Sequence, residues 1–175
     1  MNSITKLLLL PAVFAAGQLQ AENLFYNGSF ELGKCGYSFD RFYRPKVNPK
    51  LERNLPVLDE TTKTEGRYSL RVDNPYQEEY RVQCKDFILP ANAKVNISFY
   101  AKGENGITAQ TDFRAPKKPI NLGGKYVHLS KEWKKYSFSI QTGKDQGGGY
   151  VLRFCRAPGL AGSFWLDDIR VSVDG

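Results

Sequence analysis

Regular alternation of apolar and polar residues runs through several short segments of the chain. In the clearest of them, residues 95–102, the apolar side chains Val95, Ile97, Phe99 and Ala101 fall on one side. Successive side chains of a strand point to opposite faces, so a period of two predicts half-buried β-strands. Segments with this pattern are 68–73, 95–102, 136–141, 150–154 and 165–173, with weaker candidates at 37–43, 80–89 and 107–114.

Turn signals separate these segments. Clusters of Gly, Pro and Asn lie between the expected strands, and such clusters are typical of tight turns. No stretch beyond residue 21 sustains the 3.6-residue period of an amphipathic helix. About eight short strands with regular turns predict an all-β fold, a two-sheet antiparallel β-sandwich of the jelly-roll type. Residues 44–56 and 115–131 are expected to be its longer loops.

The N-terminal residues have the pattern of an export signal. Lys6 is followed by an apolar run over 7–16 and then by small residues up to Ala21, which is typical of a secretory signal peptide. The run is shorter than the roughly 20 apolar residues of a membrane-spanning helix; an ordinary buried helix is the alternative. We expect residues 1–21 to be a signal peptide without a lipid anchor, and residues 22–175 to be one secreted or periplasmic domain.

Composition excludes some chemistry and suggests a partner. With one His and three Cys among 175 residues, the chain cannot form a multi-histidine or a four-thiolate zinc site. The net charge is +7, or +6 without residues 1–21, and residues 34–53 contribute +4 of it. A basic surface attracts polyanions, which for an exported protein indicates an acidic polysaccharide rather than nucleic acid. A generic solvated basic surface is the alternative.

The three cysteines occupy different contexts. Cys84 and Cys155 lie in strand-like segments, and Cys35 lies in a turn beside glycine. Disulfides form in compartments outside the cytoplasm, so we expect a Cys84–Cys155 disulfide. The alternative is three isolated thiols, two of them buried as small apolar side chains.

Five motifs follow one another along the chain, and they read Asn27-Gly28-Ser29-Phe30-Glu31, Glu65-Gly66-Arg67-Tyr68-Ser69-Leu70, Val95-Asn96-Ile97-Ser98-Phe99-Tyr100, Trp133-Lys134-Lys135-Tyr136 and Trp165-Leu166-Asp167-Asp168-Ile169. This order resembles the carbohydrate-binding modules of the family 4/9/22 type, which are galactose-binding-domain-like jelly rolls. The resemblance covers residues 23–173 and implies a sandwich that binds polysaccharide without catalysis. The chain departs from the family at Gly36-Tyr37, where a Gly-Trp pair is usual.

The resemblance also implies a structural calcium ion where the first and last strands meet, with Glu31 and Asp167 as ligands. Asp167 shares the alternation face of Trp165, Ile169 and Val171, which we expect to be buried. A buried carboxylate needs a cation or several donors, and calcium takes six to eight oxygen ligands. The alternative is that Asp167 accepts backbone N–H bonds or pairs with an arginine.

Candidate ligand-binding residues lie on outward positions of the expected strands and just beyond them. Proteins bind sugars by stacking aromatic rings on them and by bonding their hydroxyls with amide, carboxylate and guanidinium groups. The alternative is an ordinary polar sheet face. The expected ligand-binding residues are Arg41, Tyr43, Tyr100, Gln110, Asp112, Arg114 and Arg153.

No catalytic residue is expected. Glycoside hydrolysis needs two carboxylates that flank one bond, and no signature of a jelly-roll glucanase or a small alginate lyase occurs in the chain. His128 lies in a segment expected to be a loop, and no nucleophile motif accompanies it. The sequence therefore predicts a monomeric, non-catalytic protein that binds polysaccharide or oligosaccharide, with no nucleic-acid partner and no membrane segment after signal removal. A protein-interaction jelly roll and a small polysaccharide-active enzyme are the alternatives.

Overall fold

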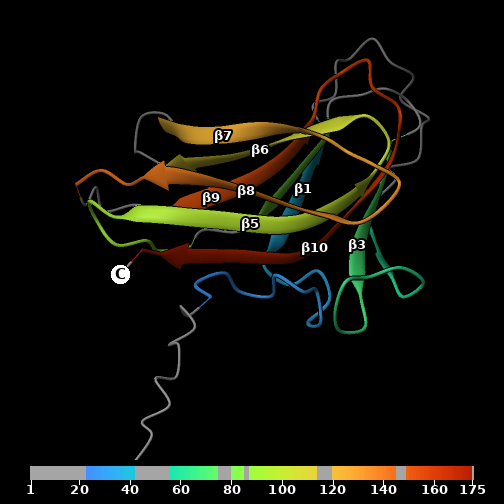
Figure 1. Ribbon diagram of the computed structural model, residues 1–175, viewed down its shortest axis with the longest axis horizontal. Coiled ribbons are helices and arrows are strands. Elements are labelled where there is room, and N and C mark those ends of the chain that lie inside the picture. Colours follow the sequence, from blue (N-terminus) through green and yellow to red (C-terminus); the bar gives the residue numbers. More distant parts are fainter. Residues whose placement is uncertain are drawn as a thin grey trace, which may run out of the picture.

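The computed structural model describes residues 23–41, 56–74, 80–84, 87–113, 120–144 and 149–174. These residues form ten strands and no helix, so nothing helical in them is long or apolar enough to cross a membrane. The strands make two antiparallel sheets of five strands each (Figure 1). The expected all-β jelly roll is confirmed, whereas the expected signal peptide lies outside the described residues.

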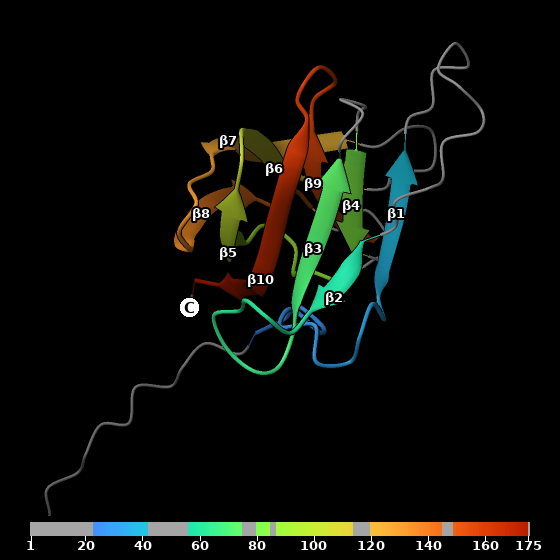
Figure 2. The same cartoon turned by 90° about the vertical axis from the view of Figure 1, so that its right-hand side faces the viewer.

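The two sheets form separate layers (Figure 2). Sheet A has the strand order β1-β4-β9-β6-β7 and sheet B the order β2-β3-β10-β5-β8. Sheet A consists of β1 (Tyr37–Arg41), β4 (Tyr80–Cys84), β9 (Tyr150–Arg156), β6 (Gly106–Phe113) and β7 (Ile120–His128). Sheet B consists of β2 (Val57–Asp59), β3 (Ser69–Asn74), β10 (Gly162–Val173), β5 (Lys94–Gly103) and β8 (Lys134–Gln141).

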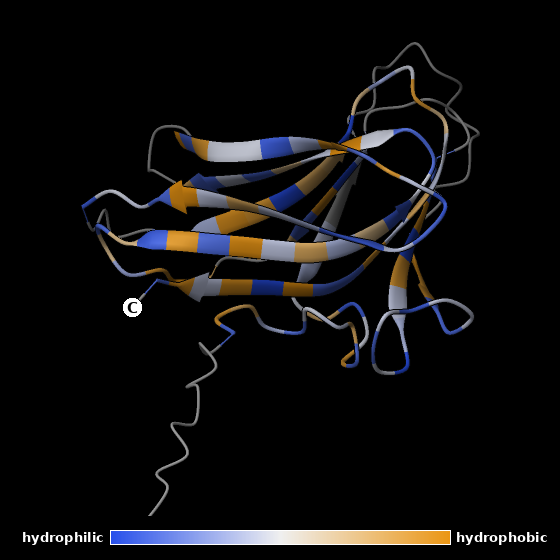
Figure 3. Cartoon of the chain, viewed as in Figure 1, coloured by the Kyte–Doolittle hydropathy of each residue, from blue (hydrophilic) through white to orange (hydrophobic). Residues whose placement is uncertain are grey.

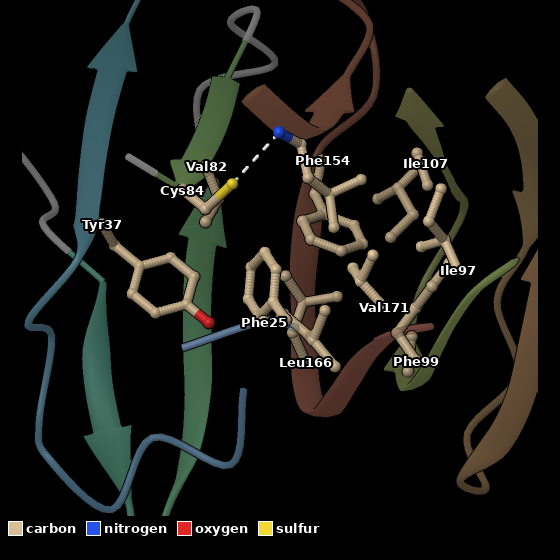
Figure 4. Packing of buried hydrophobic residues seen from close by; sticks show 14 of the residues in the cluster. Phe25, Tyr37, Val82, Cys84, Ile97, Phe99, Ile107, Phe154, Leu166 and Val171 are labelled. Atoms are coloured by element: carbon tan, nitrogen blue, oxygen red, sulfur yellow. Dashed lines mark hydrogen bonds between the residues drawn. The ribbon is translucent and has the colours of Figure 1, made fainter. Parts of the chain in front are cut away.

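Alternation along the strands builds the core between the sheets. On β5 the apolar residues from Val95 to Ala101 are buried and the polar residues between them face outward, an alternation visible along β5 in Figure 3. The inward side chains of both sheets interdigitate, as expected where two sheets pack face to face. Phe99 packs edge-on against Phe154 with ring centroids 4.9 Å apart (Figure 4). The period-two pattern thus identified the core strands correctly.

A bulge in β10 changes which residues of that strand face the core. Asp167 pairs with Tyr100 and Arg170 pairs with Ser98, so β10 has one more residue than β5 between these pairs. One extra residue reverses the alternation of a strand. Leu166 before the bulge and Ile169 after it are both buried, and Trp165 points outward. The expectation that Trp165 shares the buried face of Ile169 is therefore wrong.

The segment expected to be a loop over 115–131 contains a strand. β7 pairs with β6 as a hairpin, in which Phe113 pairs with Ile120 at the connected end and Gly106 pairs with His128 at the other end. Gly123 has a φ of +134°, a conformation that favours glycine. This glycine lies beside an irregularity in the β6–β7 register and interrupts the alternation of β7, which is why the pattern there did not resemble a strand.

The Asn27-Gly28-Ser29-Phe30-Glu31 motif closes one end of the sandwich against β10. The backbone N–H of Ile169 donates to the Gly28 carbonyl at 3.0 Å, and a Cβ on Gly28 would lie only 1.9 Å from the Ile169 carbonyl oxygen. The Asn27 side chain holds the turn by accepting from the Leu32 N–H and donating to the Gly33 carbonyl. Phe30 is fully buried. The close approach to β10 requires glycine at position 28, and the two bonds of the turn use the side-chain amide of Asn27.

The predicted Cys84–Cys155 disulfide is wrong. The two residues lie on the paired strands β4 and β9, but Cys84 faces the core and Cys155, which pairs with Arg81, faces outward. Side chains on opposite faces of a sheet cannot reach disulfide geometry. Cys84 Sγ instead accepts the Leu152 N–H at 3.0 Å, drawn as the dashed line in Figure 4.

Candidate functional site

Polar side chains form a row across the outer surface of sheet A, called here the sheet A face. Gln83 of β4 pairs in register with Arg153 of β9, and Arg153 pairs with Gln110 of β6. Residues directly opposite each other on neighbouring strands share a face. Asp112 lies two residues beyond Gln110 on the same side of β6. Sequence alternation predicted that Gln110, Asp112 and Arg153 face outward, and the structure brings these three together.

Hydrogen bonds and one ion pair join this row into a network. Arg153 Nε donates to Gln83 Oε1 at 2.7 Å, and the Arg153 guanidinium forms an ion pair with Asp112. Gln110 Nε2 donates to the same Asp112 carboxylate at 3.3 Å. The side chains are 14% exposed for Arg153 and 3% for Asp112. A network that is bonded and mostly buried holds its donors and acceptors in fixed positions.

The β7 side of the row is open. On β7, Gly124 pairs with Gln110 and carries no side chain beside it, while Tyr126 pairs with Thr108 and is 48% exposed. The Tyr126 ring packs edge-on against His128 with centroids 4.9 Å apart and covers Gly106. Gly106 precedes Gln110 by four residues on β6, or about 13 Å of strand. The sheet A face therefore carries an exposed ring farther along the strands from the fixed amide and guanidinium groups.

The remaining predicted ligand-binding residues have different outcomes. Arg41 is the last residue of β1, where its backbone pairs with that of Tyr80 at the edge of sheet A. Tyr43 and Arg114 lie outside the described residues. Tyr100 pairs with Asp167 in sheet B, so it lies on the opposite side of the sandwich from Gln110. Tyr100 and Gln110 therefore do not share a face, because β5 and β6 belong to different sheets.

Sequence reasoning missed Gln83 and Tyr126. Gln83 lies in the alternating run Val82-Gln83-Cys84, which predicts an outward side chain at this position but does not identify its neighbours. Tyr126 lies in the segment that was expected to be a loop. Strand pairing, which the alternation pattern does not specify, brings Gln83 to Arg153 and places Tyr126 opposite Thr108 on the same face.

The carboxylates expected to bind calcium both hold the connection between β2 and β3. Asp167 is buried, and its Oδ2 accepts from the Thr64 N–H and hydroxyl, each at 2.7 Å. Its Oδ1 accepts the Asp168 N–H at 2.7 Å. Glu31 Oε1 accepts the N–H groups of Arg67 and Tyr68 at 2.8 and 3.0 Å. Burial raises the pKa of Asp167, and the bonds from Thr64 oppose this shift.

This donor set fits the hydrogen-bonded alternative for Asp167 better than a calcium site. Calcium requires oxygen ligands, including backbone carbonyls, whereas the backbone here presents N–H groups to both carboxylates. Among the described residues, no three acidic, histidine or cysteine side chains gather around one point. Calcium at this position remains a prediction, which a thermal melt with a chelator tests.

Comparisons with known proteins identify the fold. No protein-family model and no curated protein sequence matches the chain. The structure is similar to a family 16 carbohydrate-binding module, with a TM-score of 0.62, 12% identity, and coverage of 85% of this chain and 99% of the other. It is similar to a family 61 carbohydrate-binding module in complex with β-1,4-galactotriose, with a TM-score of 0.61, 13% identity, and coverage of 88% and 100%.

The same fold also occurs in an enzyme. The Stig cyclase Fisc from Fischerella sp. TAU has a TM-score of 0.62 and 15% identity, with coverage of 89% of this chain and 98% of the other. At such identities the similarity establishes the jelly-roll fold of carbohydrate-binding modules and nothing more specific. One fold hosts many functions, so function has to be argued from the site.

Proposed function

We propose that this protein is an exported, monomeric carbohydrate-binding protein that holds polysaccharide on the sheet A face without changing it chemically. The observation that carries the proposal is the row of Gln83, Arg153, Gln110 and Asp112, fixed by mutual bonds on the same face as the exposed Tyr126 ring. A polysaccharide that runs along β6 spans the distance between the row and this ring. Fixed polar groups and an aromatic ring on one face are what such a chain needs, because its hydroxyls require positioned partners and its C–H faces require a ring.

The charge of the chain favours acidic polysaccharides. Within the row, Arg153 is neutralised by Asp112, so attraction to a polyanion comes from the rest of the protein, whose net charge without residues 1–21 is +6. Long-range attraction of this kind weakens as salt screens it. Binding to alginate or polygalacturonate is therefore expected to weaken from low to high salt, whereas binding to neutral xylan or galactan is expected to change little.

The row offers no pair of catalytic carboxylates. Asp112 is its single carboxylate, and Arg153 occupies it. Glycosidases use two carboxyl groups with about 5–9 Å between them. We therefore expect no release of reducing ends and no unsaturated uronates from any of these four polysaccharides.

Native affinity gel electrophoresis tests the proposal. Wild-type protein is expected to be retarded by at least one of the four polysaccharides. Gln110→Ala removes one hydrogen-bonding group from the row and is expected to reduce the retardation. Gln141→Ala is the matched control, because Gln141 is an exposed glutamine at the end of β8 in the other sheet. The proposal is wrong if no polysaccharide retards the wild type at any salt concentration.

A further inference from the structure

The outer surface of sheet B, called here the sheet B face, carries both tryptophans of the chain. Trp165 points outward from β10, and Trp133 precedes β8. The Lys102 ammonium lies over both indole rings, 5.5 Å from the Trp133 centroid and 5.1 Å from that of Trp165. Trp133 Nε1 also donates to Thr62 Oγ1 at 3.1 Å. These contacts fix the orientation of the Trp133 ring.

A pocket of about 320 Å³ lies beside this ring. The outward side of the bulged β5–β10 pair forms its floor. The connection between β2 and β3 forms a wall, in which Thr64 donates two hydrogen bonds to the buried Asp167. A volume of this size is at the lower end for small-molecule sites and is large enough for one or two sugar rings. The pocket is lined by Lys63, Thr64, Glu65, Tyr100, Trp133 and Asp168.

The bulge in β10 directs a carboxylate to this pocket. Asp168 is the extra residue and has a φ of +43°, which is uncommon for residues other than glycine and occurs most often at Asn and Asp. Bulges commonly re-aim a side chain next to a binding site. Ile169 remains in the core, so the strained residue adds the Asp168 carboxylate to the pocket lining without loss of packing.

Charges of both signs surround the pocket. Arg170 Nε donates to Asp168 at 2.6 Å, and its Nη2 lies 3.3 Å from Glu65. Lys63 is the second cation and Glu65 the second carboxylate of the group. Burial and the neighbouring Asp168 carboxylate raise the pKa of Glu65. Lys102 and Lys135 add two more cations, over the Trp133 and Tyr100 rings. Arg170 pairs with both carboxylates of the lining, so the pocket presents hydrogen-bonding groups of both kinds, which suits a ligand with several hydroxyls.

We propose that this pocket is a second carbohydrate site, which binds one or two residues of a neutral glycan against Trp133 and Tyr100. Glu65 and Asp168 accept hydrogen bonds from the hydroxyl groups of the glycan. The proposal rests on the proposed function, because it extends the same ligand class to the other side of the protein. The two faces belong to opposite layers of the sandwich (Figure 2), so one straight chain cannot occupy both. The protein therefore bridges two glycan chains.

Tryptophan emission reports on this site alone, because the described part of the sheet A face has no tryptophan and both tryptophans of the chain lie on the sheet B face. Titration with β-1,4-galactotriose, xylohexaose and cellohexaose is expected to shift the emission of the wild type. The shift is expected to persist in Gln110→Ala, since that change affects only the first site. Trp133→Ala and Glu65→Gln are expected to weaken this binding by up to roughly tenfold.

Turbidity of galactan, xylan and cellulose-derived glucan solutions tests the bridging. Wild-type protein is expected to cross-link the polymer that it binds, and Glu65→Gln is expected to bind it without cross-linking. Glu65 lies partly exposed on a loop, so its amide variant is expected to fold even if Trp133→Ala does not. Tyr26→Ala is the control, since Tyr26 is an exposed aromatic in the N-terminal segment, away from the pocket.

The readouts separate the two proposals. Retardation in affinity gels that falls with Gln110→Ala, combined with unchanged tryptophan emission and no turbidity, overturns the second site and leaves the proposed function intact. An emission shift that Glu65→Gln reduces, without any effect of Gln110→Ala in gels, supports the pocket and overturns the role of the sheet A face. No emission shift with any of the three oligosaccharides overturns the second site.

Discussion

The sheet A face and the sheet B face use their cations in different ways. On sheet A, Arg153 is nearly buried and is joined to a carboxylate and an amide. On sheet B, Arg71 and Lys102 lie over the Trp165 ring, at 5.5 and 5.1 Å from its centroid. A mostly buried carboxylate neutralises Arg153, whereas Arg71 pairs with the partly exposed Asp73 and both sheet B cations also contact a ring face.

The difference shows that the period-two pattern, which placed both sets of residues outward, does not determine what an outward residue does. Burial makes the sheet A network a structural unit whose members depend on one another. Exposure makes each sheet B contact a weak, separate interaction. The following experiments compare matched positions on the two faces.

Arginine removal is expected to give the largest difference. Arg153→Ala leaves Asp112 as a buried charge without its guanidinium partner, and such a change costs about 3–5 kcal/mol in the free energy of unfolding. Arg71→Ala removes an ion pair with Asp73 in which the arginine side chain is 42% exposed, together with one ring contact, for about 1 kcal/mol. Urea unfolding followed by circular dichroism measures both values. Equal losses would contradict the distinction between the faces.

Tyrosine removal is expected to give an intermediate effect, and on binding rather than on stability. Tyr126→Ala removes the exposed ring on the same face as the sheet A row and is expected to weaken polysaccharide binding by about 1 kcal/mol, or roughly fivefold. Tyr26→Ala deletes a ring that is 62% exposed in the N-terminal segment and is expected to leave the affinity unchanged. Isothermal titration calorimetry on the two variants provides the comparison. An equal loss in both would remove Tyr126 from the binding surface.

Acid is expected to give a smaller, optically visible effect confined to sheet B. Burial tends to raise the pKa of Asp59, but hydrogen bonds from Thr61 and Trp165 outweigh it and hold the pKa below its usual value. A carboxyl group with a lowered pKa contributes stability above its unfolded pKa, near 3.8, and this stability is lost as pH falls through the folded pKa. Trp165 emission is therefore expected to change below about pH 4, and in Asp59→Asn this change is expected to disappear.

Chelation is expected to have the smallest effect. Because N–H groups already satisfy Asp167 and Glu31, EDTA is expected to leave the Tm unchanged, whereas Asp167→Ala is expected to lower it. A Tm that falls with EDTA and returns with added calcium would instead establish the calcium site that the sequence resemblance implies. The same melts therefore decide between the two roles of Asp167.

Local alternation was sufficient to predict the core strands and the outward positions of Gln110, Asp112 and Arg153, because these depend only on side-chain direction within one strand. Two local irregularities made the prediction from alternation wrong at Trp165 and over β7. The extra residue at Asp168 moved Trp165 to the outer face, and Gly123 concealed β7. A bulge and a glycine of positive φ each affect a single position, so a search for periodic patterns does not detect them.

Features that depend on pairing between distant strands could not be predicted in this way. The assignment of β5 and β6 to different sheets separates Tyr100 from Gln110. The phase of β4 against β9 places Cys84 and Cys155 on opposite faces. The sheet B pocket requires the connection between β2 and β3 to fold back onto β10, which is a contact across 103 residues. Alternation carries no information about such contacts.

The attachment of the N-terminal segment to β10 has a consequence for how the chain folds. Asn23 accepts from the Val171 N–H across 148 residues, and the Gly28 carbonyl accepts from Ile169. The N-terminal segment thus finds its partner only when β10 has been synthesised. Contacts at such separation slow folding, because loop closure precedes any gain from pairing. The sandwich therefore closes only after β10 has been synthesised, and a nascent chain that still lacks β10 is expected to remain open to a chaperone.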